Sequence, residues 1–270
     1  MNLHNKNAVI YGVGESLGGA VARALATAGA KVFLTARDLK KAQAVADSIQ
    51  ATGGQAEAAC VDALDEAAVN HHAAGVAQRA GSLDVSFNLI DLRGAQSNPL
   101  TEMTCADFVQ PVMIAMRTQF LTATAAGRIM SRQGSGVILT LTATPGGIGY
   151  ANVGGFGPAC CAIEGFSKNL AAELGVHGVR VVNIRSAGSP DSRPFREARA
   201  HGGPDVAAFF EKLKQDTMLK ALPLMEDIAN TAVFLASPLA GKITGVTLDV
   251  TAGTTSALNY KVPAIAFVKS

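Results

Sequence analysis

The stretch that decides the fold is residues 7–19, with the sequence NAVIYGVGESLGG. Its first five residues, Asn7–Tyr11, have the composition of a short buried strand, and the apolar spacing of a helix begins at Leu17. Glycines at a joint between strand and helix, here Gly12 and Gly18, let the backbone turn sharply and approach a phosphate group. The N–H groups at the start of the helix then face that phosphate. The stretch therefore predicts a dinucleotide-binding β-α unit.

The same alternation of short apolar runs and Ala-rich amphipathic stretches continues along the chain. We expect strands at Asn7–Tyr11, Lys31–Ala36, Ala56–Val61, Leu83–Asn88, Gly136–Leu141, Val179–Ile184 and Val246–Val250. We expect helices at Leu17–Ala28, Leu39–Ala51, Glu66–Ala80, within Cys105–Ser131, at Ala159–Gly175 and at Met225–Ala236. Strict alternation predicts the α/β class: a doubly wound parallel sheet of seven strands with helices on both faces.

Residues 186–222 break this rhythm, because prolines and glycines surround one short amphipathic segment, Val206–Met218. We expect a lid-like excursion above the sheet and not a second domain. The prediction is a single domain over residues 1–270.

Composition limits the classes of function. Hydrophobic residues make up 49% of the chain and the net charge is +2, without a basic cluster, so a large core is expected and nucleic acid is not an expected partner. No apolar run reaches the ~20 residues of a membrane helix, so no membrane association is expected. The four cysteines lack the spacing of metal ligands, which predicts reduced thiols, no metal and a cytoplasmic protein.

The glycine loop resembles that of the short-chain dehydrogenase/reductase family, Thr-Gly-x-x-x-Gly-Ile-Gly. Gly12 and Gly18 are in place, Tyr11 stands at the threonine and Ser16 at the middle glycine. Further segments resemble the family in register: Asp62, Leu83–Asp91, Gly178–Asn183, Ala187-Gly188, Asp227–Ser237 and Ile243–Gly245. The resemblance implies a Rossmann fold, a nicotinamide dinucleotide, a small-molecule substrate and a homodimer or homotetramer paired through the two long helices near 105–131 and 159–175.

The resemblance also implies the residues that contact the cofactor. They are Gly12, Gly14, Ser16, Leu17, Gly18, Arg37, Asp62, Ala63, Asn88, Leu89, Ile90, Gly188 and Ser192. A carboxylate at the end of the second strand selects NAD, whereas an arginine there accommodates the 2′-phosphate of NADP. Ala36 stands at that position and Arg37 follows it, which favours NADP(H). NAD(H) remains open, because Arg37 can be a solvated loop charge and Glu15 would oppose the phosphate.

The family catalyses carbonyl reduction or alcohol oxidation with Asn, Ser, Tyr and Lys, and the register places other residues at all four positions. These are Ala115, Ala143, Phe156 and Cys160. A phenyl ring exchanges no proton, and a thiol supplies no fixed positive charge. Thr142, Thr144 and Asp91 are the remaining candidates for a catalytic role, although Asp91 can equally belong to a surface ion pair with Arg93.

Three functions stay open at this point. The first is an NADP(H)-dependent oxidoreductase of non-standard mechanism, and the second is an inactive homologue that binds nucleotide as a regulatory or binding protein. The third is a cofactor-assisted enzyme without net redox chemistry. Apolar residues in the expected lid, among them Phe195, Phe209 and Phe210, predict an apolar ligand, but they can also serve as lid packing.

Overall fold

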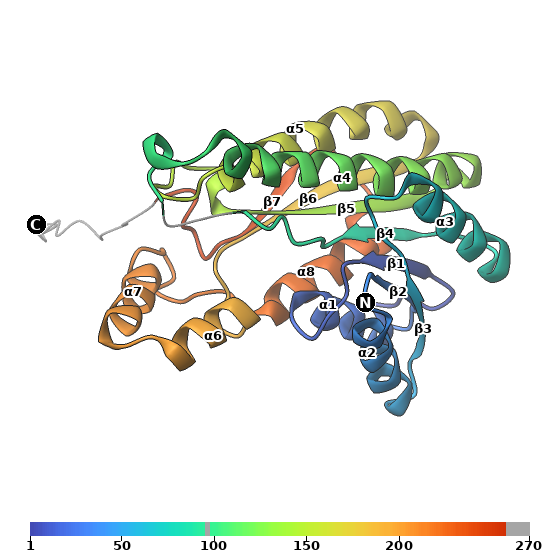
Figure 1. Ribbon diagram of the computed structural model, residues 1–270. Helices are drawn as coiled ribbons and strands as arrows, with labels where there is room; N and C mark the ends of the chain where they lie inside the picture. The colour runs from blue at the N-terminus through green and yellow to red at the C-terminus, as the bar shows by residue number, and fades with distance from the viewer. Residues whose placement is uncertain (95–97, 258–270) are drawn as a thin grey trace, which may run out of the picture.

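The computed structural model describes residues 1–94 and 98–257, and it shows one sheet of seven parallel strands (Figure 1). The strands are β1 Asn7–Tyr11, β2 Lys31–Ala36, β3 Gln55–Cys60, β4 Val85–Asn88, β5 Gly136–Ala143, β6 Val179–Ser186 and β7 Thr247–Val250. Their order is β3-β2-β1-β4-β5-β6-β7, and every neighbouring pair is parallel. This confirms the predicted doubly wound, seven-stranded α/β fold.

Helices cover both faces of the sheet. They are α1 Leu17–Thr27, α2 Leu39–Ala51, α3 Glu66–Ala80, α4 Cys105–Gln133, α5 Phe156–Leu174, α6 Arg193–His201, α7 Pro204–Gln215 and α8 Met225–Ala236. Helices α1, α2 and α8 pack on one face, and α3, α4 and α5 on the other (Figure 1). Within the described residues, none of these helices is long and apolar enough to cross a membrane.

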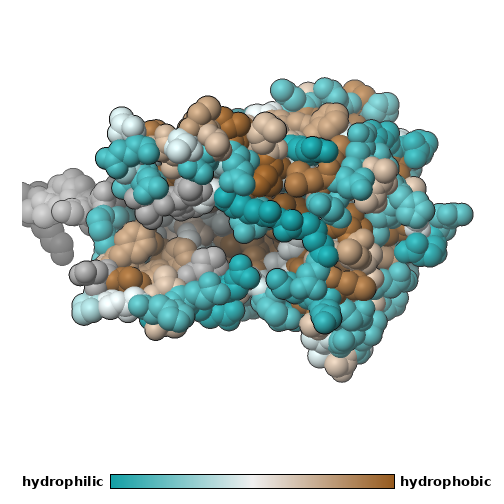
Figure 2. All heavy atoms as spheres, in the orientation of Figure 1, coloured by the Kyte–Doolittle hydropathy of each residue, from teal (hydrophilic) through white to brown (hydrophobic). Residues whose placement is uncertain are grey.

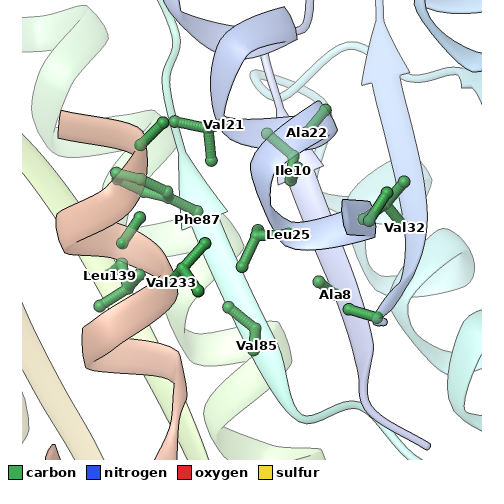
Figure 3. Packing of buried hydrophobic residues seen from close by; sticks show 14 of the residues in the cluster. Ala8, Ile10, Val21, Ala22, Leu25, Val32, Val85, Phe87, Leu139 and Val233 are labelled. Carbon is green, nitrogen blue, oxygen red and sulfur yellow. The ribbon is translucent and has the colours of Figure 1, made fainter. Parts of the chain in front are cut away.

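The core under α1 and α8 shows why the strands are apolar on both sides. Val21 and Leu25 of α1 and Val233 of α8 lie against Phe87 and Leu139 of the sheet (Figure 3). Burying an aliphatic or aromatic side chain of this size stabilises a fold by about 1.5–3 kcal/mol. The central strands β1 and β4, which are buried along their whole length, therefore need apolar side chains on both faces.

Helix α5 begins at Phe156, three residues before the predicted start at Ala159. Gly157 and Pro158 resemble a loop in the sequence, but both lie in the first turn of the helix. A proline is tolerated there because the first N–H groups of a helix have no partner within it. As a result, Phe156 and Cys160 lie one turn apart on the same helix.

Residues 186–222 contain two helices, α6 and α7, where the sequence predicted one amphipathic segment. Pro204 was interpreted as part of a loop, yet it is the first residue of α7, a position that suits its fixed φ. The two helices form a lobe beside the sheet body (Figure 1), which we call the lid, and the surface is hollowed between lid and body (Figure 2).

Candidate cofactor and catalytic sites

The sheet has its topological switch point between β1 and β4, where the chain order reverses. In open α/β sheets, ligands bind at the carboxyl ends of the strands at this point. The loop from β1 to α1 lies there, and two of its glycines are required by shape. Gly12 has φ +83°, and a Cβ on it would lie 2.7 Å from the carbonyl oxygen of Leu89. A Cβ on Gly18 would lie 2.9 Å from the carbonyl oxygen of Gly12.

The loop from β1 to α1 also leaves open space for a ligand beside Gly14. A Cβ on Gly14 would meet no atom within 4 Å, so the space on that side is open. Leu17 is the first residue of α1, and the first N–H groups of this helix face outward without intrahelical partners. The loop therefore fits the pyrophosphate of a dinucleotide: a glycine-shaped backbone, open space and free N–H donors.

Ser16 stands where the family pattern has its middle glycine, and its φ of −89° is not in the left-handed region that would require glycine. Its hydroxyl accepts a hydrogen bond from the backbone N–H of Arg193 (3.2 Å) and donates one to Sδ of Met225 (3.4 Å). The sequence did not indicate either contact, because both partners lie more than 170 residues away in the chain.

The positions expected around the adenine and ribose lie at the ends of β3 and β4. Asn88 is buried, donates from Nδ2 to Thr122 Oγ1 (3.1 Å) and accepts from the N–H of Ile90 (2.9 Å). The N–H of Leu89 donates to the carbonyl of Tyr11 (2.9 Å), which fixes this segment beside β1. In the next loop, Asp62 is exposed and accepts from the N–H of Leu64 (3.0 Å), while Ala63 is buried.

Arg37 lines an open cleft of about 710 Å³ at the end of β2. The cleft also contains Lys40, and the Asp38 carboxylate accepts from the Lys40 N–H (3.1 Å) as the N-cap of α2. Within the described ranges, neither Arg37 nor Glu15 forms an ion pair. Sequence reasoning missed Lys40, although a second cation three residues after Arg37 was the available signal.

On the lid side, Gly188 and Ser192 lie between β6 and α6. A Cβ on Gly188 would lie 2.3 Å from the ring of Phe195, so this glycine is required by packing. Ser192 is the N-cap residue of α6, and its N–H donates to the carbonyl of Ser189 (3.0 Å). The Ser189 hydroxyl oxygen is buried and has no hydrogen-bond partner within residues 1–94 and 98–257.

The four positions that the resemblance assigns to the family's catalytic residues lie around the end of β5 and the start of α5. Ala115 is fully buried in a small apolar cluster with Leu92, and Phe156 packs against this cluster. Cys160 is 1% exposed and contacts the backbone of Ala143, and its burial raises the pKa of the thiol to about 11. Ala115, Ala143 and Phe156 carry no titratable group, and the Cys160 thiol stays protonated and uncharged near neutral pH.

Thr142 does not face this group, because its hydroxyl belongs to a buried network on the α5 side of the sheet. It donates to Oε1 of Glu164 (2.9 Å) and accepts from Nδ2 of Asn183 (2.7 Å). Glu164 also binds Arg185 through two bonds, Nε to Oε1 (2.9 Å) and Nη2 to Oε2 (2.6 Å). Arg185 Nη1 reaches both oxygens of Asp249, at 3.0 and 3.2 Å. These bonds hold the pKa of Arg185 above its usual value.

The buried network supports the loop from β5 to α5. A Cβ on Gly146 would lie 2.3 Å from Oε1 of Glu164, and one on Gly147 would lie 2.7 Å from Nη1 of Arg185. The backbone of this loop therefore rests directly on the ion pair. Sequence reasoning did not identify Glu164 and Arg185 as partners, because they lie on different elements and share no motif.

The two other catalytic candidates are placed differently. Thr144 is buried at the start of the 3₁₀ turn Thr144–Gly146, beside Ala143. Asp91 is exposed, and its carboxylate accepts from the backbone N–H of Arg93 (3.1 Å). Among the described residues Asp91 forms no ion pair with Arg93, so the alternative of a surface ion pair has no support in this geometry.

A Rossmann-type fold with a glycine-shaped loop at its switch point defines a class of nucleotide-binding α/β proteins. The family model described as enoyl-(acyl carrier protein) reductase matches residues 12–255. The chain belongs to the short-chain dehydrogenase/reductase family, an oxidoreductase family that binds nicotinamide cofactors.

Individual relatives agree with this assignment. The chain is 31% identical over 254 residues to the short-chain reductase protein NovJ of Streptomyces niveus, covering 91% of this chain and 92% of the relative. It is 29% identical over 259 residues to the 7alpha-hydroxysteroid dehydrogenase of Escherichia coli K12, covering 96% and 98%. A gluconate 5-dehydrogenase from Burkholderia cenocepacia, solved with NADP and tartrate, has the same fold, with a TM-score of 0.85 at 24% identity over 95% and 98% of the two chains.

Proposed function

We propose that this chain binds NADP(H) and acts as an oxidoreductase without the family's Tyr–Lys acid–base pair. The observation that carries the proposal is the cleft at the end of β2, which Arg37 and Lys40 line together with Asp38 and Asp47, while Ala36 leaves no carboxylate at the selecting position. A guanidinium and an ammonium together suit the 2′-phosphate of NADP(H). The uncharged 2′-hydroxyl of NAD(H) would form no ion pair with these two cations. The cradle of Gly12, Gly14 and Gly18, with Asn88 and Asp62 behind it, would hold the rest of the dinucleotide.

When bound, a reduced nicotinamide supplies a hydride equivalent. We call the end of β5 and the start of α5 the catalytic edge. There Phe156 is apolar and cannot act as an acid or base, and Cys160 is a buried neutral thiol that supplies no positive charge. Thr144 follows Ala143 directly, and its hydroxyl takes no part in the buried network, so we assign it the role of a hydrogen-bond donor to the substrate. The substrate must therefore take its proton from water or need none.

A second candidate is the inactive homologue that binds nucleotide as a regulatory or binding protein. One observation favours it specifically: Ala115 and Phe156 belong to one apolar cluster with Leu92, Ala159 and Ile163. Such packing serves stability and supplies no chemistry. The two candidates share the cofactor and differ only in whether a substrate is turned over.

Calorimetric titration of the purified protein with NADPH and with NADH tests the shared part of both candidates. We expect saturable binding of NADPH and at least tenfold weaker binding of NADH, as loss of a charged contact implies. Tighter binding of NADH would overturn the choice of cofactor. A subsequent screen of small apolar ketones, aldehydes and quinones with NADPH separates the oxidoreductase from the inactive homologue.

We also propose that the chain is a homodimer or homotetramer that pairs through α4 and α5. Val109, Met113 and Phe120 form an apolar stripe on α4, with Met113 63% and Phe120 54% exposed. Replacing Phe120 by Glu places a charge in the proposed interface, so light scattering should show a smaller species than the wild type.

All four cysteines are free, which supports a reducing compartment such as the cytoplasm.

A further inference from the structure

Three helices begin next to Ser16. Helix α1 begins directly after it at Leu17, α6 begins at Arg193 and α8 begins at Met225. The Ser16 hydroxyl contacts the first residue of each of the two distant helices, through the Arg193 N–H (3.2 Å) and Met225 Sδ (3.4 Å). One side chain thus joins the glycine loop to the lid and to α8.

This use of the hydroxyl differs from ordinary helix capping. A serine before a helix usually accepts from an N–H in the first turn of its own helix. Ser16 precedes α1 but makes no such bond. The glycine that the family pattern has at this position carries no side chain and cannot make the contact with the lid. The link between loop and lid is therefore a property of this chain.

Hydrogen bonds attach the lid to the body at both ends. After α7, the N–H of Leu219 donates to the carbonyl of Ala252 (3.2 Å), and two further attachments lie at the base of the lid. The Asp191 carboxylate accepts from the N–H of Met225, at 3.1 and 3.2 Å, and the next attachment is the bond between Arg193 and Ser16. The Arg193 side chain does not hold the lid, because it is 63% exposed and its one ion pair in the described chain is with Glu197 on α6 itself. The backbone N–H of Arg193 is the attachment point of α6.

We propose that Ser16 is a positioning residue that ties the lid to the glycine loop before the cofactor binds. Through this tie the start of α6 stays beside the start of α1, so that both helices present N–H groups to the place of the pyrophosphate. The inference rests on the proposed function for the identity of that ligand. A lid that is already in position loses less conformational freedom on binding, and this raises affinity.

Two substitutions remove the same hydrogen bond from opposite sides. Ser16→Ala removes the acceptor. Arg193→Pro removes the donor N–H at the first position of α6, where proline is tolerated and where the preceding Ser192 is already extended (φ −71°, ψ 154°). Arg193→Gln is the matched control, because it removes the charge and keeps the N–H. Ser16→Thr keeps the hydroxyl and should behave as the wild type.

The first readout is amide hydrogen exchange of α6 in the cofactor-free protein, with trypsin cleavage after Arg196 and Arg199 as a second measure. Ser16→Ala and Arg193→Pro should each speed exchange and cleavage by roughly three- to tenfold, the equivalent of one hydrogen bond. The double variant should change no more than either single one, because the bond is lost only once. Lid protection in Ser16→Ala equal to that of the wild type, or additive effects in the double variant, overturns the proposal.

The second readout is affinity for NADPH, which should fall by roughly three- to tenfold in both variants and stay unchanged in Arg193→Gln. A wild type that does not bind NADPH contradicts the proposed function, while the exchange measurement still decides whether Ser16 ties the lid. Normal affinity in a Ser16→Ala variant with a loosened lid overturns the link between lid position and cofactor binding.

Discussion

The proposed cofactor edge of the sheet, at the ends of β1 to β4, is shaped by its backbone. The proposed catalytic edge, at the end of β5 and the start of α5, is defined by single side chains. At the proposed cofactor edge, the loop after β1 has glycines at positions where an added Cβ would clash with the backbone, which suits a phosphate-binding loop. Arg37 and Lys40 line an open cleft beside it. At the proposed catalytic edge, Phe156 is apolar, Cys160 is a buried neutral thiol, and Glu164 binds Arg185.

The difference has a physical origin. The cofactor edge works through backbone N–H groups and the shape that glycines allow, so many residues would have to change to destroy it. The catalytic edge works through single functional groups at fixed points, so one substitution at each point removes the chemistry. On the proposed function, this chain keeps the fold of its family without the family's usual acid–base side chains.

The largest expected effect comes from restoring the catalytic edge. Ala143→Ser, Phe156→Tyr and Cys160→Lys together place a hydroxyl, a phenol and an ammonium on a backbone that already has the right spacing, one helical turn between 156 and 160. General acid catalysis contributes ~10²–10⁴ in rate, so NADPH-dependent ketone reduction should rise by that order. A folded triple variant that binds NADPH but reduces no ketone would show that the backbone at this edge has also diverged. Phe156→Tyr alone is the control and should stay near the parent.

The buried ion pair should give the next largest effect. Arg185→Ala leaves the buried Glu164 carboxylate without its cation and should lower the free energy of unfolding by about 3–5 kcal/mol in urea titrations. Glu164→Ala should cost less, because Arg185 keeps its ion pair with Asp249. Replacing both by apolar residues, Glu164→Ile with Arg185→Val, should be nearly neutral, because no unpaired buried charge remains. A double variant as unstable as the single ones would mean that the network stabilises the loop at Gly146 beyond the pairing itself.

Arg37 tests the cofactor edge. Arg37→Ala should weaken NADPH binding by about 1.5–3 kcal/mol, the range for a charged hydrogen bond, and leave NADH nearly unchanged. Lys40→Ala should act in the same direction with a smaller loss. Calorimetry with both nucleotides measures this, and equal losses for NADPH and NADH would contradict the assignment of this cleft to the 2′-phosphate.

The smallest expected effect is a change of the free energy of unfolding with pH, caused by His72 of α3. His72 of α3 lies edge-on to the buried Tyr11 ring, and burial lowers the pKa of His72 to about 4. The unfolded chain binds a proton on this histidine below about pH 6.5, whereas the folded chain does not until about pH 4. The free energy of unfolding should therefore fall by about 1–3 kcal/mol as the pH is lowered from about 6.5 to about 4. His72→Gln should flatten this part of the profile, and an unchanged profile would assign the acid sensitivity to other groups.

The sequence predicted the strands, the helix order and the glycine loop because each depends on local patterns: apolar period, glycine position and the spacing between elements. It placed Ala115, Ala143, Phe156 and Cys160 at the catalytic edge by register alone, without their surroundings. It missed the early start of α5 and the helix α6, because prolines in first turns resemble loop signals. It could not predict the contacts of Ser16 or the Glu164–Arg185 pair, because tertiary contacts between distant segments leave no periodic trace.

One fluorescence titration tests the contrast between the two edges most directly. NADPH is added to the wild-type protein until its emission on binding saturates, and a panel of simple ketones is then added to the same cuvette. We predict a saturable rise with NADPH and no decay of the signal with any ketone above the protein-free rate, since the cofactor edge is intact and the catalytic edge has no proton donor. Absence of the rise, or rapid decay that persists in Asp91→Asn and Cys160→Ala variants, would contradict this account.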